Sequence, residues 1–321
     1  MDEAPRLRVT VMAVQVSVVI PTQRRPEGLA RAVRSIMAQQ GVEPATLELV
    51  VVDNDQVPSA KAAVEAFAAG APWPVVYRHE PEPGVSSARN VGVAAVRGAF
   101  IAFLDDDEEA RPHWLAALLY AQRAYDADVV FGPVTAQVPE RLSHRDYLQR
   151  FFSRQGPAQS GSIGHFYGCG NSLIRLAALP EPEAPFPLER NQSGGEDDVV
   201  FRRMRAAGAR FAWAADAEVW EHPAPERMNL AYVLRRAFAF GQGGSSTVAG
   251  RRPRHWVRVA VSMAKGVVQA GGAAALAALF WAARSPRYVF LLEHVARGLG
   301  KVFWSRRFYA PFYGKTAGQA S

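Results

Sequence analysis

Short apolar, β-branched runs alternate with segments of helical periodicity over residues 16–104, and this alternation restricts the fold more than any other feature. The runs typical of buried strands are Val16–Ile20, Leu47–Val52, Val75–His79 and Ala99–Leu104. The helical segments between them are Gly28–Gln40, Ala60–Ala69 and Ser86–Val96. Strands that are apolar on both faces are typical of parallel sheets covered by helices. The pattern predicts an α/β domain with a mainly parallel central sheet flanked by helices.

Beyond residue 105 the alternation is less regular. The proline-rich segment Pro180–Pro187 predicts a loop. The other predicted elements are the helices Trp114–Tyr125 and Asp197–Ala207 and the strands Val129–Phe131, Phe211–Trp213 and Ala217–Trp220.

Charge divides the chain near residue 222. Residues 1–222 carry 22 basic and 28 acidic side chains, a net charge of −6, whereas residues 223–321 carry 15 basic and 2 acidic ones, a net charge of +13. The acidic part is a poor nucleic-acid binder, whereas the basic part could meet phosphate, either of a nucleic acid or of an anionic membrane. Of these two partners we expect the membrane and no nucleic acid. The single cysteine, Cys169, excludes an internal disulfide and a zinc site built on several thiolates. The acidic start, Met1-Asp2-Glu3, is unlike a signal peptide and predicts a cytoplasmic protein.

The basic part differs from the rest in composition as well as charge. We therefore expect two domains, a larger one over residues 1–228 and a basic, aromatic helical extension over residues 229–321. Gly266–Ala283 is a charge-free stretch of 18 residues, which is close to the length that a membrane-inserted helix needs. Tyr288–Trp304 combines apolar and basic positions, as helices at a membrane interface do. The extension predicts contact with the inner face of an anionic membrane, and the alternative is packing on the domain or on a partner chain.

Polar side chains follow the predicted strands at the points where they end: Thr22 and Arg24, then Asp53 and Asp55, then Asp105, Asp106 and Asp107. Clustered carboxylates repel each other, so they need a cation or a donor-rich ligand. Oxygen ligands suit Mg²⁺ or Mn²⁺, which are commonly held by one or two carboxylates together with substrate phosphates. The pattern predicts a substrate such as a nucleoside diphosphate. The alternative is that these acids form turns, or that Asp107, Glu108 and Glu109 begin the next helix.

Two further segments carry candidate residues. Arg89 lies on the helix before the strand that leads to the aspartates, where it can contact a base or phosphate or form a salt bridge to the rim. Gly194-Gly195 precedes Glu196 and Asp197 at the start of a predicted helix. Glycines there allow close approach to a ligand, and the carboxylate that follows can be a helix cap or a general base.

Five segments, in this order and spacing, resemble the family-2 glycosyltransferases: Val16–Thr22, Val50–Asn54, Gly84–Gly92, Phe103–Asp107 and Gly195–Asp197. Together they cover roughly residues 14–222. The resemblance implies a GT-A fold and an inverting transfer of a sugar from a nucleotide-sugar. A UDP-sugar is the expected donor, and a GDP- or dTDP-sugar is the alternative. It also implies a Mg²⁺ or Mn²⁺ cofactor.

The resemblance assigns roles to particular residues. Asp197 would be the general base, with Glu196 positioning it or the acceptor. Asp107 and Asp105 would form the DxD motif as metal ligands, and a histidine at the place of His222 completes the metal site in some relatives. Residues implied to bind the nucleotide-sugar are Pro21, Thr22, Arg24, Asp53, Arg89, Asp105, Asp106 and Asn171. Cys169, beside Asn171, is expected to be a packing residue.

The chain departs from one branch of that family. It lacks the Gln-x-x-Arg-Trp motif of processive synthases in the matching region Leu234–Gly241, which favours addition of a single sugar. Its second half resembles bacterial enzymes that build exopolysaccharide units on a lipid carrier, so a hydroxyl of a glycan or lipid-linked saccharide is the implied acceptor. The alternatives are an inactive scaffold of a polysaccharide assembly complex, and a sugar nucleotidyltransferase, whose glycine-rich phosphate loop and lysine are missing from Pro21–Arg25.

Overall fold

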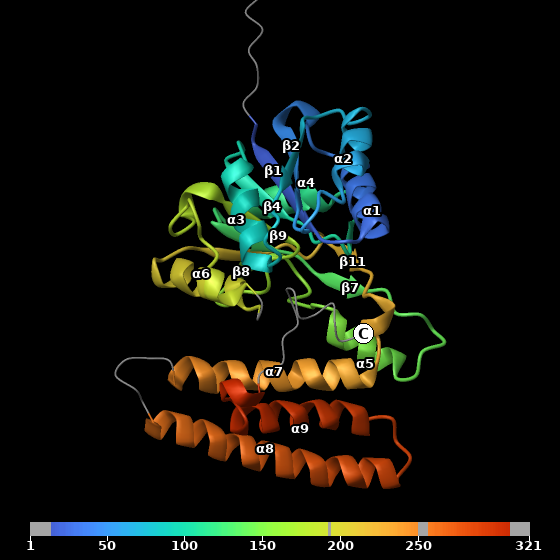
Figure 1. Cartoon of the computed structure of the whole chain (residues 1–321), viewed down its shortest axis with the longest axis vertical. Coiled ribbons are helices and arrows are strands. Elements are labelled where there is room, and N and C mark those ends of the chain that lie inside the picture. The colour runs from blue at the N-terminus through green and yellow to red at the C-terminus, as the bar shows by residue number, and fades with distance from the viewer. Residues whose placement is uncertain (1–13, 192–193, 250–255, 309–321) are drawn as a thin grey trace, which may run out of the picture. The chain divides into compact units, whose positions relative to one another are not determined.

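A computed structural model of the chain describes residues 14–191, 194–249 and 256–308, which form two compact units (Figure 1). The first unit contains the described residues up to Val134 together with Gln155–Trp220. The second contains Thr135–Arg154 and the described residues from Glu221 on.

The first unit is built on an eight-stranded sheet with the order β3-β2-β1-β4-β9-β6-β10-β8. Its strands are β1 (Val16–Thr22), β2 (Leu47–Asp53), β3 (Val75–His79), β4 (Phe100–Phe103), β6 (Val129–Phe131), β8 (Gly161–Ile163), β9 (Ser172–Arg175) and β10 (Phe211–Trp213). The first four strands of the order, β3 to β4, pair in parallel, as does β6 with β10. The predicted α/β fold with a mainly parallel central sheet is confirmed.

Two strands of this sheet run against their neighbours. Strand β9 lies antiparallel between β4 and β6, and β8 lies antiparallel to β10 at the edge. Neither strand was predicted. A second sheet has three strands in the order β5 (Glu108–Ala110), β11 (Val219–Glu221) and β7 (Val134–Ala136). The prediction that Glu108 and Glu109 begin a helix is therefore wrong, because these residues are extended in β5 and the helix begins at Trp114.

Helices cover both faces of the large sheet, with α1 and α2 on one side and α3 and α6 on the other (Figure 1). The helices of the first unit are α1 (Pro26–Met37), α2 (Lys61–Ala68), α3 (Val85–Ala95), α4 (Trp114–Ala124) and α6 (Glu196–Ala206). Alternate residues of β1 enter different cores: Val18 packs in the cluster of α1 and α4, and Val19 packs in the cluster of α3 and α6. This two-sided burial explains why the strand sequence is apolar without alternation.

The second unit is helical. Its helices are α5 (Arg145–Phe152), α7 (Leu230–Ala249), α8 (Trp256–Ala282) and α9 (Tyr288–Val302). Helix α9 packs against both α7 and α8 and lies between them (Figure 1). Tyr147 and Leu148 of α5 share a small core with Val233 of α7 and Val289 of α9. The segment 135–154, which the sequence interpretation placed in the first domain, therefore belongs with the C-terminal helices.

Candidate active site

The carboxyl ends of β1, β2 and β4 bring the polar residues of three loops to one edge of the sheet. Thr22, the last residue of β1, donates a hydrogen bond from its hydroxyl to Oδ2 of Asp106, at 2.9 Å. Asp106 belongs to the loop that follows β4, the parallel neighbour of β1. A contact between polar residues at the ends of neighbouring strands is thus observed for Thr22 and Asp106.

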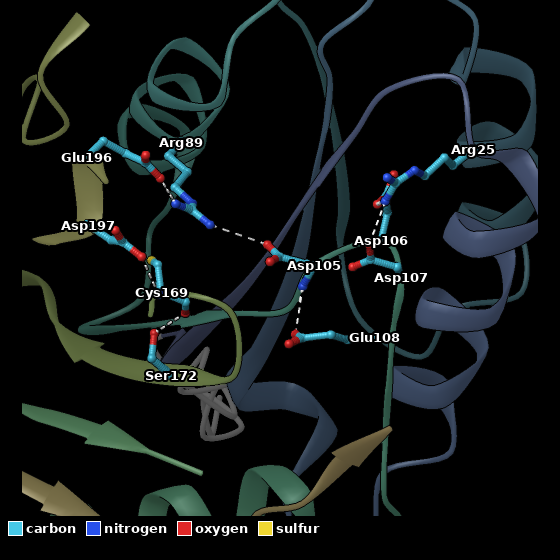
Figure 2. Close-up of polar contacts among 10 residues, drawn as sticks. All are labelled: Arg25, Arg89, Asp105, Asp106, Asp107, Glu108, Cys169, Ser172, Glu196 and Asp197. Atoms are coloured by element: carbon cyan, nitrogen blue, oxygen red, sulfur yellow. Dashed lines mark hydrogen bonds and ion pairs between the residues drawn. The ribbon is translucent and has the colours of Figure 1, made fainter. Parts of the chain in front are cut away.

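Arg25 contacts two aspartates in this loop (Figure 2). Its Nη1 lies 2.8 Å from Oδ1 of Asp106 and 2.7 Å from Oδ2 of Asp107. Asp106 is buried, and burial raises its pKa to about 6, an effect that Arg25 opposes and Asp107 reinforces. Arg25 was not among the predicted site residues. A sequence signal for Arg25 does exist: two arginines follow β1, and three aspartates follow β4, the strand beside it.

Asp105 is held differently from the two aspartates that follow it. Its backbone N–H donates to Oε2 of Glu108, at 3.0 Å, so the buried Glu108 stabilises the turn of the loop. A Cβ atom on Gly170 would lie 2.6 Å from Oδ2 of Asp105. The backbone just before β9 therefore lies close to this carboxylate. Glu108 and Gly170 were both missed as site residues, because their roles depend on loop contacts that periodicity does not report.

Arg89 of α3 is buried with a carboxylate from α6 (Figure 2). Its Nη1 donates to Oε1 of Glu196, and its Nη2 lies 3.5 Å from Oδ1 of Asp105. Of the two alternatives for Arg89, the structure contains the salt bridge to the rim. Glu196 is 2% exposed, and this burial raises its pKa to about 7, although Arg89 acts in the opposite direction.

Asp197 begins α6 beside Glu196 and is held by backbone donors. Its Oδ2 accepts a hydrogen bond from the N–H of Cys169, at 3.1 Å, and its Oδ1 accepts one from the N–H of Asp198, at 2.8 Å. Gly195 before the helix has φ +78°, a left-handed conformation that favours glycine. Carboxylates in the first turn are stabilised by the helix dipole. Cys169 is buried, which raises the pKa of its thiol, in keeping with a packing residue.

Three residues expected to bind the nucleotide-sugar are engaged with the protein itself. Asp53 is fully buried, and its Oδ2 accepts hydrogen bonds from the N–H of Ala60 and the hydroxyl of Tyr77. Arg24 pairs with Asp55, Nη2 to Oδ1 at 2.8 Å, and its hydrogen bond holds the pKa of Asp55 below the usual range.

Asn171 is the third of these residues and has the clearest structural role. It is fully buried, its Oδ1 accepts from Nε1 of Trp114 at 2.7 Å, and its Nδ2 donates to the carbonyls of Pro133 and Ala217. The amide group of Asn171 is thus used within the core of the protein, and its expected contact with a donor sugar stays a prediction.

The remaining predicted residues lie as follows. Pro21 is partly buried near the end of β1, beside the rim residue Thr22. His222 is partly buried and belongs to the second unit, just after β11.

The loop after β4 offers a divalent ion few fixed ligands. In residues 14–191, 194–249 and 256–308, no group of three or more His, Cys, Asp or Glu side chains is arranged to hold a metal. Asp105 and Asp107 have side chains that are 38% and 18% exposed, so one or both carboxylates can reach a ligand. This donor set fits an ion of the Mg²⁺ type that takes its other ligands from phosphates and water.

Comparison with known proteins decides the family. Residues 17–181 match the sequence profile described as "Glycosyl transferase family 2". The chain belongs to this family. It is 35% identical to the succinoglycan biosynthesis protein ExoM of Rhizobium meliloti over 283 residues, which are 88% of this chain and 90% of that protein. The chain is therefore a glycosyltransferase, as the resemblance of the five segments implied.

Solved structures share the fold. The mannosyltransferase PcManGT of Pyrobaculum calidifontis, in complex with GDP-Man and Mn²⁺, matches 92% of this chain and 90% of its own with a TM-score of 0.59 and 18% identity. TarS 1–349 of S. aureus, in complex with UDP, matches 71% of this chain and 65% of its own with a TM-score of 0.51 and 17% identity. The predicted GT-A architecture is thereby confirmed.

The close approach of Gly170 to Asp105 yields a test of the loop. We expect Gly170→Ala to displace the Asp105 carboxylate and to weaken UDP binding in the presence of Mn²⁺ by about tenfold, which corresponds to about 1.4 kcal/mol. The dissociation constant from isothermal titration calorimetry measures this. Gly164→Ala is the matched control, because a Cβ atom there meets nothing within 4 Å. Equal affinities for the two variants would show that the position of Asp105 is immaterial to nucleotide binding.

Proposed function

We propose that this glycosyltransferase moves one sugar from a nucleotide-sugar, a UDP-sugar by preference, to a hydroxyl of a glycan or lipid-linked saccharide, with inversion at the anomeric carbon. The observation that carries the proposal is the presence of two carboxylate groups on one rim of the first unit. The aspartates after β4 form one group, and Glu196 and Asp197 at the start of α6 form the other (Figure 2). Arg89 contacts a member of each group.

Each group has a chemical task in the proposal. Asp197 accepts the proton of the acceptor hydroxyl, whose oxygen forms a bond to the anomeric carbon. The bond from that carbon to the diphosphate oxygen breaks on the opposite face, and the nucleoside diphosphate leaves with the electron pair. A Mg²⁺ or Mn²⁺ ion held by Asp107 and Asp105 would stabilise the charge of the leaving group when bound. Asp106 and Thr22 hold the loop in place beneath these residues.

The relatives support the setting of this reaction. ExoM is named for succinoglycan biosynthesis, and the chain covers most of that protein. We therefore propose a role in assembly of a cell-surface exopolysaccharide, with non-processive addition of a single sugar. Such assembly on a lipid carrier puts the enzyme at the inner face of the cell membrane.

Helix α8 is the part of the second unit that we assign to the membrane. Within the described residues it is the one helix long and apolar enough to cross a bilayer. Small residues, Gly266, Ala270 and Ala273 among them, form its buried face toward α9. Large apolar side chains are exposed elsewhere on it: Val257, Val261, Val267, Val268, Leu276, Leu279 and Trp281.

The contacts of α8 with α9 favour a position along the membrane surface over one across it. Lys301 of α9 donates to Oε1 of Gln269 on α8, at 2.6 Å, and α9 also carries the ion pair of Arg297 with Glu293. A spanning α8 would draw these charged groups into the hydrocarbon, which is costly. An amphipathic helix that lies in the interface avoids this cost. The basic residues Arg258 and Lys265 on α8 itself suit anionic headgroups.

The role of Asp197 is tested by Asp197→Asn. We expect the rate of sugar transfer to fall at least about 100-fold, because general-base catalysis is lost. UDP affinity should remain, since the base does not contact the nucleotide in this proposal. The assay measures release of nucleoside diphosphate from UDP- and GDP-sugars with octyl β-glucoside as the acceptor. Asp198→Asn is the control on the next residue, and near wild-type turnover of Asp197→Asn would refute the base assignment.

Metal binding is tested by Asp107→Asn. We expect UDP affinity to fall in Mn²⁺ but to stay unchanged in EDTA, because the carboxylate acts through the ion. Calorimetric titration under both conditions gives the comparison. An equal loss in Mn²⁺ and EDTA would mean that Asp107 acts only as the partner of Arg25.

Membrane contact is tested by charges on the exposed face of α8. Val268 and Leu279 are 76% and 66% exposed, so a glutamate at either position leaves the packing with α9 intact. Each change should lower binding to phosphatidylglycerol vesicles at least about tenfold, because about 1.5 kcal/mol of apolar burial is lost. Vesicle flotation measures the bound fraction. Tyr120→Glu, at an exposed aromatic of the first unit, is the control, and unchanged flotation of the α8 variants would exclude this face.

A further inference from the structure

Helix α3 holds the segment that leads into α6. The side chain of Asn191 accepts a hydrogen bond from the N–H of Ser87 at 3.0 Å and donates one to Oγ of Ser87 at 2.9 Å. Asn90 makes a similar pair with the backbone N–H and carbonyl of Phe186. The segment before Gly194 and Gly195 is therefore fixed to α3 in two ways: the Asn90 side chain of α3 contacts the segment's backbone at Phe186, and the segment's Asn191 side chain contacts Ser87 of α3.

Arg89 extends the same face of α3 to α6 itself. It is 6% exposed, and its two terminal nitrogens point to different elements: Nη1 to Glu196 on α6 and Nη2 to Asp105 after β4 (Figure 2). Phe186 lies under the guanidinium, 5.8 Å from its carbon to the ring centroid. Among the described residues, Oε2 of Glu196 and Nε of Arg89 have no hydrogen-bond partner.

A buried pair with unfilled hydrogen-bonding positions is a poor source of stability, because removing two charges from water costs about as much as their attraction returns. Its physical effect is geometric. The planar guanidinium fixes the direction of each bond it donates, which an ammonium group would not do. Arg89 thereby sets the position of the first turn of α6 relative to the loop after β4.

We propose that Arg89, with Glu196, is a positioning residue that holds the neighbouring Asp197 at the distance from the donor loop that transfer requires. This rests on the proposed function, in which Asp197 is the base and Asp105 belongs to the donor site. It differs from the role implied by the family resemblance, in which Arg89 contacts the nucleotide. The two roles predict different kinetic changes, because a positioning residue affects kcat and a nucleotide ligand affects affinity.

The double variant Arg89→Met/Glu196→Leu tests the proposal without leaving a buried unpaired charge. Removal of both partners at once is often close to neutral for stability, so the variant should keep the wild-type melting temperature. We expect kcat for transfer to octyl β-glucoside to fall about 100-fold, the scale of a 1 Å misplacement. The Kd for UDP should change less than about threefold, well under the tenfold step of 1.4 kcal/mol.

Two single variants complete the test: Glu196→Gln removes the negative charge of the pair, and Glu48→Gln is its matched control. Glu48 is also a buried carboxylate paired with an arginine, Arg97, but it lies at the amino end of β2. Glu196→Gln should lower kcat, and Glu48→Gln should leave it unchanged. A Kd for UDP that rises as much as kcat falls would overturn the proposal in favour of a nucleotide contact, and so would an unchanged kcat in the double variant.

Hydrogen exchange gives a readout that does not require turnover. The amides of residues 200–203 close the first turns of α6, and they should exchange at least about tenfold faster in the double variant than in wild type, whereas Glu48→Gln should not alter them. Unchanged exchange there would overturn the positioning role. If wild type and Glu48→Gln release no nucleoside diphosphate from any donor tested, the proposed function fails, and the exchange result still decides whether Arg89 positions α6.

Discussion

Repulsion among carboxylates at one edge of the sheet is the constraint on which the site depends. Asp105, Asp106 and Asp107 follow a single strand, and Glu196 and Asp197 begin a helix on the same rim. Burial raises the pKa values of Asp106 and Glu196, and the neighbouring negative charges add to this effect because each makes the next carboxylate harder to ionise. The protein opposes this with arginines from two directions, so that the aspartates are divided between Arg25 and Arg89.

The packing of the sheet makes this division possible. Arg25 precedes α1, on one face of the sheet, and Arg89 lies on α3, on the other. The loop after β4 runs between them, and Thr22 of β1 and the neighbouring Glu108 fix it from within. The geometry of the rim therefore follows from the two hydrophobic cores, and a change in either core would move one arginine relative to the aspartates.

The elements that were predicted well are those with a local signal. Strands β3, β6 and β10 have the predicted bounds, because each is a short apolar or aromatic run between turn residues. Strand β9 was missed, since its four residues are extended only through pairing with β4 and β6, which are distant in sequence. A helix start at Glu108 was one of the alternatives because acids favour helix starts, but Glu108 is the first residue of β5 and its carboxylate accepts a hydrogen bond from the backbone N–H of Asp105.

The site shows the same limit. The aspartates and the Gly-Gly-Glu-Asp segment are visible as motifs because their residue types are unusual together. The roles of Asn171 and Arg25 are not visible in this way, since each depends on partners tens of residues away. The side chain of Asn171 forms hydrogen bonds with Trp114, Pro133 and Ala217, and no sequence pattern links Asn171 to these three residues. A motif thus identifies which residues are exceptional, and the tertiary contacts decide which of them remain available to a ligand.

The division into two units makes the charge asymmetry sharper than the sequence boundary did. Segment 135–154 carries four arginines and two acids, Glu140 and Asp146, and it packs with the basic helices. Because segment 135–154 belongs to the second unit and not to the first, the first unit is more acidic and the second more basic than the sequence boundary suggested. An acidic rim is repelled by an anionic membrane, but screening limits that repulsion to about 8 Å at physiological salt. In the proposed membrane-bound enzyme, the basic unit would therefore attract the lipid surface while the carboxylates of the rim stay available for the proposed cation and phosphate ligands.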